Sequence, residues 1–111
     1  MATIFDLLNE VRNRPSMYVG WSDRKAQLQH LESILYGYER ALGAHDIDEP
    51  GVGFSRAFMD YLTETQGWDT TCGIAATLLE NCSNEAQAWE RFWEVVEQFR
   101  RERGEAPGRS A

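Results

Sequence analysis

The side chains that could perform acid–base or metal chemistry are spaced as on the surface of helices. Carboxylates recur at helical intervals, in the pair Asp60 and Glu64 and in the series Glu90, Glu94 and Glu97. General acid–base catalysis and metal binding need carboxylates that are partly buried and that converge in a cleft. Acidic residues three or four positions apart on the polar side of a helix instead form a solvated face. We therefore predict that these residues are not catalytic.

The histidines, cysteines and serines give no catalytic pattern either. His30 lies beside an apolar stripe and His45 lies in an acidic loop, and neither has a close cysteine or histidine partner of the kind found in zinc sites. Cys72 and Cys82 fall in one expected helix, roughly 15 Å apart and too far for a disulfide. We expect both to be buried small hydrophobic residues. No serine has the sequence context of a nucleophile elbow.

The segment 44–53 has the order Asp-x-Asp-x-x-Gly, which resembles the start of a calcium-binding loop. However, Pro50 occupies the third ligand position, and Ala57 stands where the loop needs a bidentate glutamate. We therefore expect no calcium site. Together with the preceding observations, this predicts a protein that is not an enzyme and that needs no metal or cofactor.

Helices are expected to position all of these residues. Apolar residues recur with helical spacing, and no segment alternates with period two. The predicted helices span Thr3–Asn13, Asp23–Leu42, Ser55–Gln66, Thr70–Asn81 and a last, aromatic helix from Ser83 or Asn84 to Arg103. With 111 residues the chain has room for one modest core. We predict an all-α domain at 1–103, a compact bundle of about five helices, and a flexible tail at 104–111.

The segment between the first two predicted helices has residue types that helix packing alone does not require. Pro15 forces Arg14 out of the α region, so the first helix must end there. A short apolar run around Tyr18 follows, and Gly20 allows a turn before Trp21. One interpretation is a packed connector. The other is a contact with a partner or ligand, because a rigid loop presents its side chains at low entropic cost.

The same segment carries a family resemblance. The residues from Val11 to Gly20, Val-Arg-Asn-Arg-Pro-Ser-Met-Tyr-Val-Gly, resemble the Arg-Pro-Gly-Met-Tyr-Ile-Gly segment of the gyrase B-type ATPase family. In that family the adjoining helix carries a glutamate that activates water and an asparagine that holds magnesium. The corresponding positions here are near Ile34 and Tyr38, which can do neither, and the glycine-rich nucleotide-binding segments are missing. We therefore exclude ATP hydrolysis.

The net charge of −7 is unevenly distributed along the chain. Residues 44–90 contain nine acidic side chains against one basic side chain, Arg56. This acidic middle disfavours nucleic-acid or anionic-membrane binding and favours a basic protein partner. No apolar run approaches the roughly 18 residues of a membrane span, and the N-terminus lacks the pattern of a secretory signal. We expect a cytoplasmic protein.

Several short segments of the sequence resemble segments of a group of small bacterial proteins that includes immunity proteins of toxin systems. These segments are Arg14 to Gly20, Gly37 to Ala41, Phe54 to Leu62, Gly67-Trp68 and the aromatic last helix. The resemblance implies a protein that occludes a toxin's active site or a neighbouring surface, and it implies no catalytic residue. Many toxins are basic nucleases, which an acidic inhibitor suits through charge complementarity.

We therefore predict a non-enzymatic protein that neutralises a toxin by direct contact. The partner-binding residues that we predict are Arg14, Tyr18, Trp21, Asp46, Asp48, Glu49 and Trp68. Two alternatives remain open. One is a small-ligand-binding or regulatory domain with a pocket between helices, lined by Tyr18, Tyr38 and Trp68. The other, ranked after it, is an enzyme. The sequence also allows a homodimer formed through an aromatic face.

Overall fold

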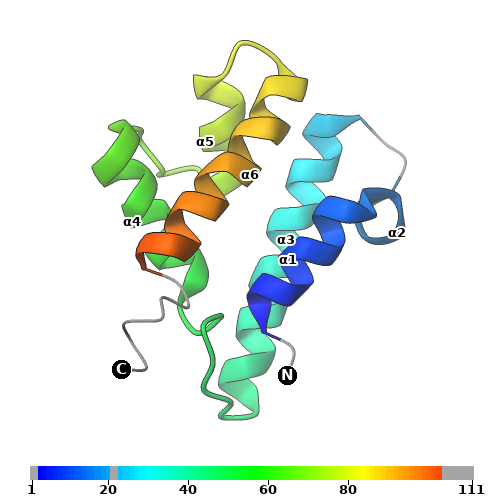
Figure 1. The fold of residues 1–111 in the computed structure, drawn as a ribbon, viewed down its shortest axis with the longest axis vertical. Coiled ribbons are helices and arrows are strands. Elements are labelled where there is room, and N and C mark those ends of the chain that lie inside the picture. Colours follow the sequence, from blue (N-terminus) through cyan, green and yellow to red (C-terminus); the bar gives the residue numbers. More distant parts are fainter. Residues whose placement is uncertain (1–2, 21–22, 104–111) are drawn as a thin grey trace.

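Capping side chains set where the helices begin. The structure is a computed structural model that describes residues 3–20 and 23–103. The helices among these residues are α1 (Ile4–Asn13), α2 (Pro15–Val19), α3 (Arg24–Ala44), α4 (Phe54–Gln66), α5 (Ile74–Asn81) and α6 (Glu85–Glu102). Thr3 and Asp6 form a capping box at the start of α1, and Asp23 and Asn84 accept hydrogen bonds at the starts of α3 and α6. The predicted all-α bundle is confirmed (Figure 1).

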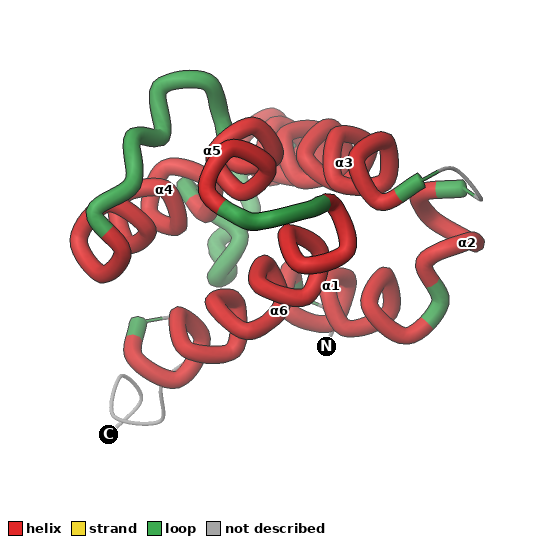
Figure 2. Tube along the Cα trace, turned by 90° about the horizontal axis from the view of Figure 1, so that it is seen from above, coloured by secondary structure: helices red, strands yellow, loops and turns green. Residues whose placement is uncertain are grey.

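The helices pack in two layers around one core. Viewed from above, α1 and α6 form one layer, and α3, α4 and α5 form the other (Figure 2). The long α3 contacts α2, α4, α5 and α6, so it is the element against which the others are placed. Rings from α4 and α6 stack edge to face between the layers, with centroids 5.4 to 5.6 Å apart: Phe54–Phe99, Phe58–Phe92, Phe58–Phe99 and Tyr61–Phe99. Such pairs add specific geometry to the burial of large apolar surfaces.

Two features differ most from the prediction, and in addition α3 ends at Ala44 rather than Leu42. The connector after Arg14 contains a helical turn, α2, because Pro15 stands at its first position, where a missing N–H costs nothing. The fourth predicted helix begins at Ile74 rather than Thr70. Gly73 precedes it with φ +98°, a conformation that interrupts a right-handed helix.

The later start of α5 also corrects the prediction for the cysteines. Cys72 is exposed in the turn before the helix, and Cys82 is the residue that ends it. The two therefore do not share a helix, and Cys72 is not a buried hydrophobic residue. Cys82 is half-buried against the core, as expected for a small apolar side chain.

Three glutamates cap helices that are distant in the sequence. Glu32 and Glu39, two turns apart on α3, accept hydrogen bonds from the first-turn amides of α5 and α4: Ile74 N–H at 2.7 Å and Ser55 N–H at 3.0 Å. Glu49 accepts from Ile4 N–H in the first turn of α1 at 3.3 Å. The residues before α4 and α5 are glycines, which have no side chain to cap with. The carboxylates thus supply the missing acceptors and favour the positive ends of the helix dipoles.

Candidate functional site

The predicted contact residues lie at three separate places. Arg14 and Tyr18 lie at the α2 end of the molecule, and the loop 45–53 lies at the opposite end of α3 (Figure 1). Because α3 has 21 residues, these ends are separated by about 30 Å. Trp68 lies in a third place, between α4 and α5, and Trp21 lies outside the described residues. The structure therefore does not gather the predicted set into one patch.

At the α2 end, Tyr18 is held in place by its own neighbours. Its hydroxyl donates to Glu10 Oε1 at 2.7 Å, and this hydrogen bond raises the pKa of Tyr18 above its ordinary value. Arg14 is exposed, and Met17 beside it is 68% exposed. The nearby hollow lined by Tyr18, Val19 and His30 is shallow and open. Among its described residues, this end presents one exposed large apolar side chain, Met17. Single exposed apolar residues are common on the surfaces of ordinary proteins.

The opposite end, where α3 passes into the loop 45–53, has a more specific arrangement. A hollow of about 410 Å³ is lined by Tyr38, Ala41, Leu42, His45, Ile47, Asp48 and Glu49. Its lining is mainly apolar, and Ile47 and Val52 of the loop are 49% and 56% exposed. Asp46 and Asp48 are exposed beside them. We name these nine residues the loop-end surface.

The loop holds its shape through one carboxylate. Glu49 Oε2 accepts from Gly51 N–H at 2.7 Å as well as from the first turn of α1. Gly51 is buried, and a Cβ there would lie 2.8 Å from Glu49 Oε1 and 2.9 Å from both Leu42 and Tyr38. Burial of the Tyr38 ring first, and the neighbouring Glu49 carboxylate second, raise the pKa of Tyr38 to about 12. Glu49 therefore organises the loop, and Asp46 and Asp48 are the acids left exposed to a partner.

The ligand pocket predicted from the sequence, lined by Tyr18, Tyr38 and Trp68, is not formed in the structure. Tyr38 lines the hollow at the loop end and Tyr18 lines the one beside α2. Trp68 packs against the core and lines a third hollow, with Cys82 and Arg91. The three aromatic side chains therefore do not converge, which overturns the pocket predicted between them.

The carboxylate pairs lie on exposed faces, where the described part of the chain holds most of them in ion pairs. Asp60 lies 3.6 Å from Arg56, Glu64 lies 2.6 Å from Arg103 and Glu94 lies 3.0 Å from Arg91. The acidic side chain of each pair is more than half exposed, so each ion pair contributes little to stability. Among the described residues, no group of three or more acidic, cysteine or histidine side chains could hold a metal ion.

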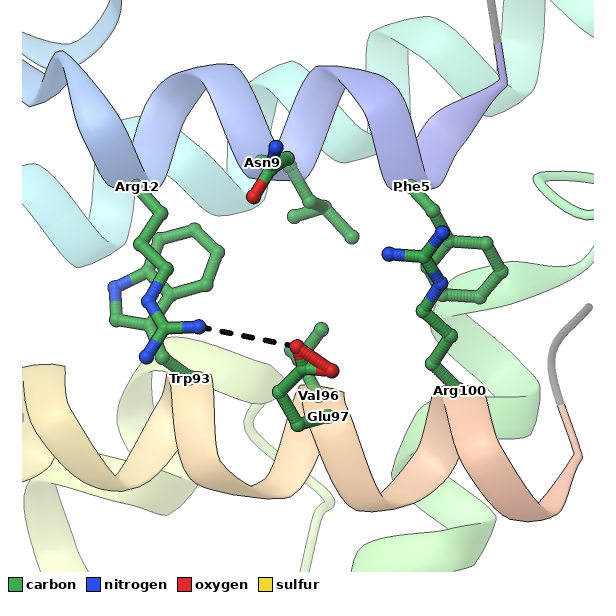
Figure 3. A pocket seen from close by; sticks show the side chains of 8 residues that line it. Phe5, Asn9, Arg12, Trp93, Val96, Glu97 and Arg100 are labelled. Atoms are coloured by element: carbon green, nitrogen blue, oxygen red, sulfur yellow. Dashed lines mark ion pairs between the residues drawn. The ribbon is translucent and has the colours of Figure 1, made fainter.

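At the interface between α1 and α6, an arginine from each helix contacts side chains of the other helix (Figure 3). The Arg12 guanidinium lies 6.0 Å from the Trp93 ring centre and 3.9 Å from Glu97, and the Arg100 guanidinium lies 5.3 Å from the Phe5 ring centre. The cavity between them holds about 20 Å³, room for about one water molecule. This interface therefore holds the two helices together through cation–π contacts and has no room for a ligand.

The sequence predicts the acidic residues of the loop-end surface, but the predicted contact residues do not include its apolar part. Ile47 and Val52 stand in an otherwise polar, glycine- and proline-containing loop, and large apolar residues in such a loop are the signal that identifies them.

Comparison with family models, curated proteins and solved structures finds no match for this chain. In the described residues, no helix has the length and apolar character needed to cross a membrane.

Proposed function

We propose that the protein is a non-enzymatic, immunity-type inhibitor that binds a basic toxin domain through the loop-end surface. The observation that carries this proposal is the joint exposure, in one loop, of Ile47, Val52, Asp46 and Asp48 beside an apolar hollow. An apolar centre with a charged rim is the usual composition of a protein–protein interface. Because the rim is acidic, the complementary partner is basic.

The loop-end surface is also supported firmly enough to act as a binding surface. The Glu49 carboxylate fixes the loop to α1, and Ile47 N–H donates to Leu42 C=O at 2.9 Å, which ties the loop to the end of α3. A surface whose loop is already ordered loses little conformational entropy when a partner binds. This supports recognition by a preformed surface rather than by a loop that folds on binding.

The test begins with capture of the tagged protein's partner from its host lysate, followed by reconstitution of the purified pair. We expect a stoichiometric, basic partner whose affinity falls as salt rises, and whose toxic activity is blocked in the complex. The double variant Asp46→Asn/Asp48→Asn should weaken binding by about tenfold, mainly by slowing association. The matched control Glu80→Gln/Glu90→Gln removes the same charge from exposed positions on α5 and α6 and should change little.

Two results would contradict the proposal. One is a captured partner whose affinity responds equally to both double variants, because general acidity would then suffice. The other is a partner that binds at the loop-end surface while its toxic activity continues, because the protein would then be an adaptor rather than an inhibitor.

A further inference from the structure

The walls of the loop-end hollow suit a long side chain with an apolar stem. One turn of α3 contributes Tyr38, Ala41 and Leu42, which share a face at the spacing i, i+3 and i+4. Ile47 of the loop also lines the hollow and is 49% exposed, so part of its apolar surface is available for contact. The hollow of about 410 Å³ is in the lower part of the size range of ligand pockets. It therefore has room for one side chain rather than for a helix or a large ligand.

Three features make the same hollow electrostatically negative. Asp48 lines it and is exposed. The carboxyl end of α3 lies beside it, and the last turn of α3 has no basic residue to offset the negative end of the helix dipole. Glu49 Oε1 is buried in its wall without a hydrogen-bond partner among the described residues. The one basic group among the lining residues is the imidazole of His45.

We propose that this hollow receives an arginine side chain of the protein partner, its stem against Ile47 and Leu42 and its guanidinium against Asp48 and the Tyr38 ring. The inference rests on the proposed function, in which a basic protein binds here. Arginine fits better than lysine because its planar, weakly hydrated head group pairs with carboxylates in two-pronged geometry and stacks on aromatic rings. Arginine is also enriched in protein interfaces, whereas lysine is depleted.

The experiment uses the whole protein and three capped tripeptides: acetyl-Gly-Arg-Gly-amide, the same peptide with lysine, and the same peptide with citrulline. Citrulline keeps the size of arginine but removes the charge. Binding is followed by NMR from the methyl signals of Ala41, Leu42 and Ile47, with Ile74 and Leu78 of α5 as internal references. One side chain supplies only weak affinity, so we expect saturation in the range of about 1 to 10 mM.

Variants locate the binding. Asp48→Asn should lower the affinity for the arginine peptide by about three- to tenfold, whereas the control Glu80→Gln should leave this affinity unchanged. Ala41→Trp places a large ring at an exposed helical position on the rim of the hollow and should abolish binding. Ala86→Trp adds the same ring to an exposed position on α6 and should not. Circular dichroism confirms that each variant keeps its helices.

The proposal predicts saturable shifts at the three α3 and loop methyls, with arginine at least about threefold tighter than lysine and citrulline weakest. Equal affinity for all three peptides, equal affinity of arginine and lysine, or shifts confined to other methyls would each overturn it.

The outcome separates the two proposals. If a basic partner is captured and responds to Asp46→Asn/Asp48→Asn but the tripeptides give no saturable shift, the inhibitor proposal stands and the arginine site fails. If the arginine peptide binds and no basic partner is found, the inhibitor proposal fails and the hollow remains a site for guanidinium groups.

Discussion

Removing the carboxylate that connects α3 to the start of α4 should destabilise the protein strongly. Glu39 Oε1 accepts from Ser55 N–H at 3.0 Å, and Glu39 Oε2 accepts from the Ser55 hydroxyl. Ser55 is 4% exposed, so in Glu39→Ala both donors lose their acceptor in a largely buried setting. The residue before α4 is Gly53, which offers no replacement cap.

The magnitude follows from these two bonds. A hydrogen bond to a charged group contributes about 1.5 to 3 kcal/mol, and leaving a buried donor unpaired costs a similar amount. Glu39 is half-buried, so water can reach part of the vacated space and lowers the cost. We therefore expect Glu39→Ala to lose about 3 kcal/mol of unfolding free energy. In a domain of this size, that lowers the melting temperature by roughly 12 to 24 °C.

The assay is urea unfolding followed by circular dichroism, with a double-mutant cycle of Glu39→Ala and Ser55→Ala. The hydroxyl bond should appear as a coupling free energy of about 1 kcal/mol or more. Glu39→Gln keeps one acceptor and should fall between wild type and Glu39→Ala. Arg40→Ala, at the next and exposed position, should stay within about 0.5 kcal/mol of wild type. A loss for Glu39→Ala no larger than that for Arg40→Ala would refute the capping role.

The remaining predictions concern backbone, proton and thiol chemistry. Gly73→Ala should lose about 1 to 3 kcal/mol, because φ is +98° and the new methyl group would meet the Glu32 carboxylate. Gly37→Ala, at an exposed helical position with open space, should instead gain about 0.5 to 1 kcal/mol, and equal effects in urea unfolding would contradict this reasoning. The pKa of Tyr38 is raised to about 12, so the folded protein keeps a proton that the unfolded chain releases above about pH 10. Stability should therefore fall from pH 10 to 12, and Tyr38→Phe should make that fall shallower; an unchanged slope would contradict the assignment. A thiol reagent should modify exposed Cys72 before Cys82, whose pKa burial raises, and mass spectrometry of partly labelled protein would reveal the opposite order.

Local signals made most of the helices predictable from the sequence. The capping box at Thr3 and Asp6 gives the start of α1, and Gly67, with φ +74°, follows the predicted last residue of α4, Gln66. The start of α5 was missed because the apolar spacing does not reveal that Gly73 adopts a positive φ. The contacts of Glu32, Glu39 and Glu49 with distant helices could not be derived, since they depend on how the helices pack.

The candidate site was only partly predictable for the same reason. Acidic composition located Asp46 and Asp48 correctly on an exposed loop. The inward position of Glu49 depends on its contact with α1, which lies 45 positions away in the sequence. The separation of Tyr18 from the loop follows from the length of α3, which keeps the two ends of the molecule apart.

Binding through the acidic loop is tested most directly by the affinity of the protein for its partner, measured by calorimetry at low and high salt. The proteins compared are wild type, Asp46→Asn/Asp48→Asn and Glu80→Gln/Glu90→Gln. We expect the loop variant to bind about tenfold more weakly than wild type at low salt. This difference should shrink at high salt, and the control variant should match wild type. Equal affinities for all three proteins at low salt would contradict the claim that this protein binds its partner through the acidic loop at the end of α3.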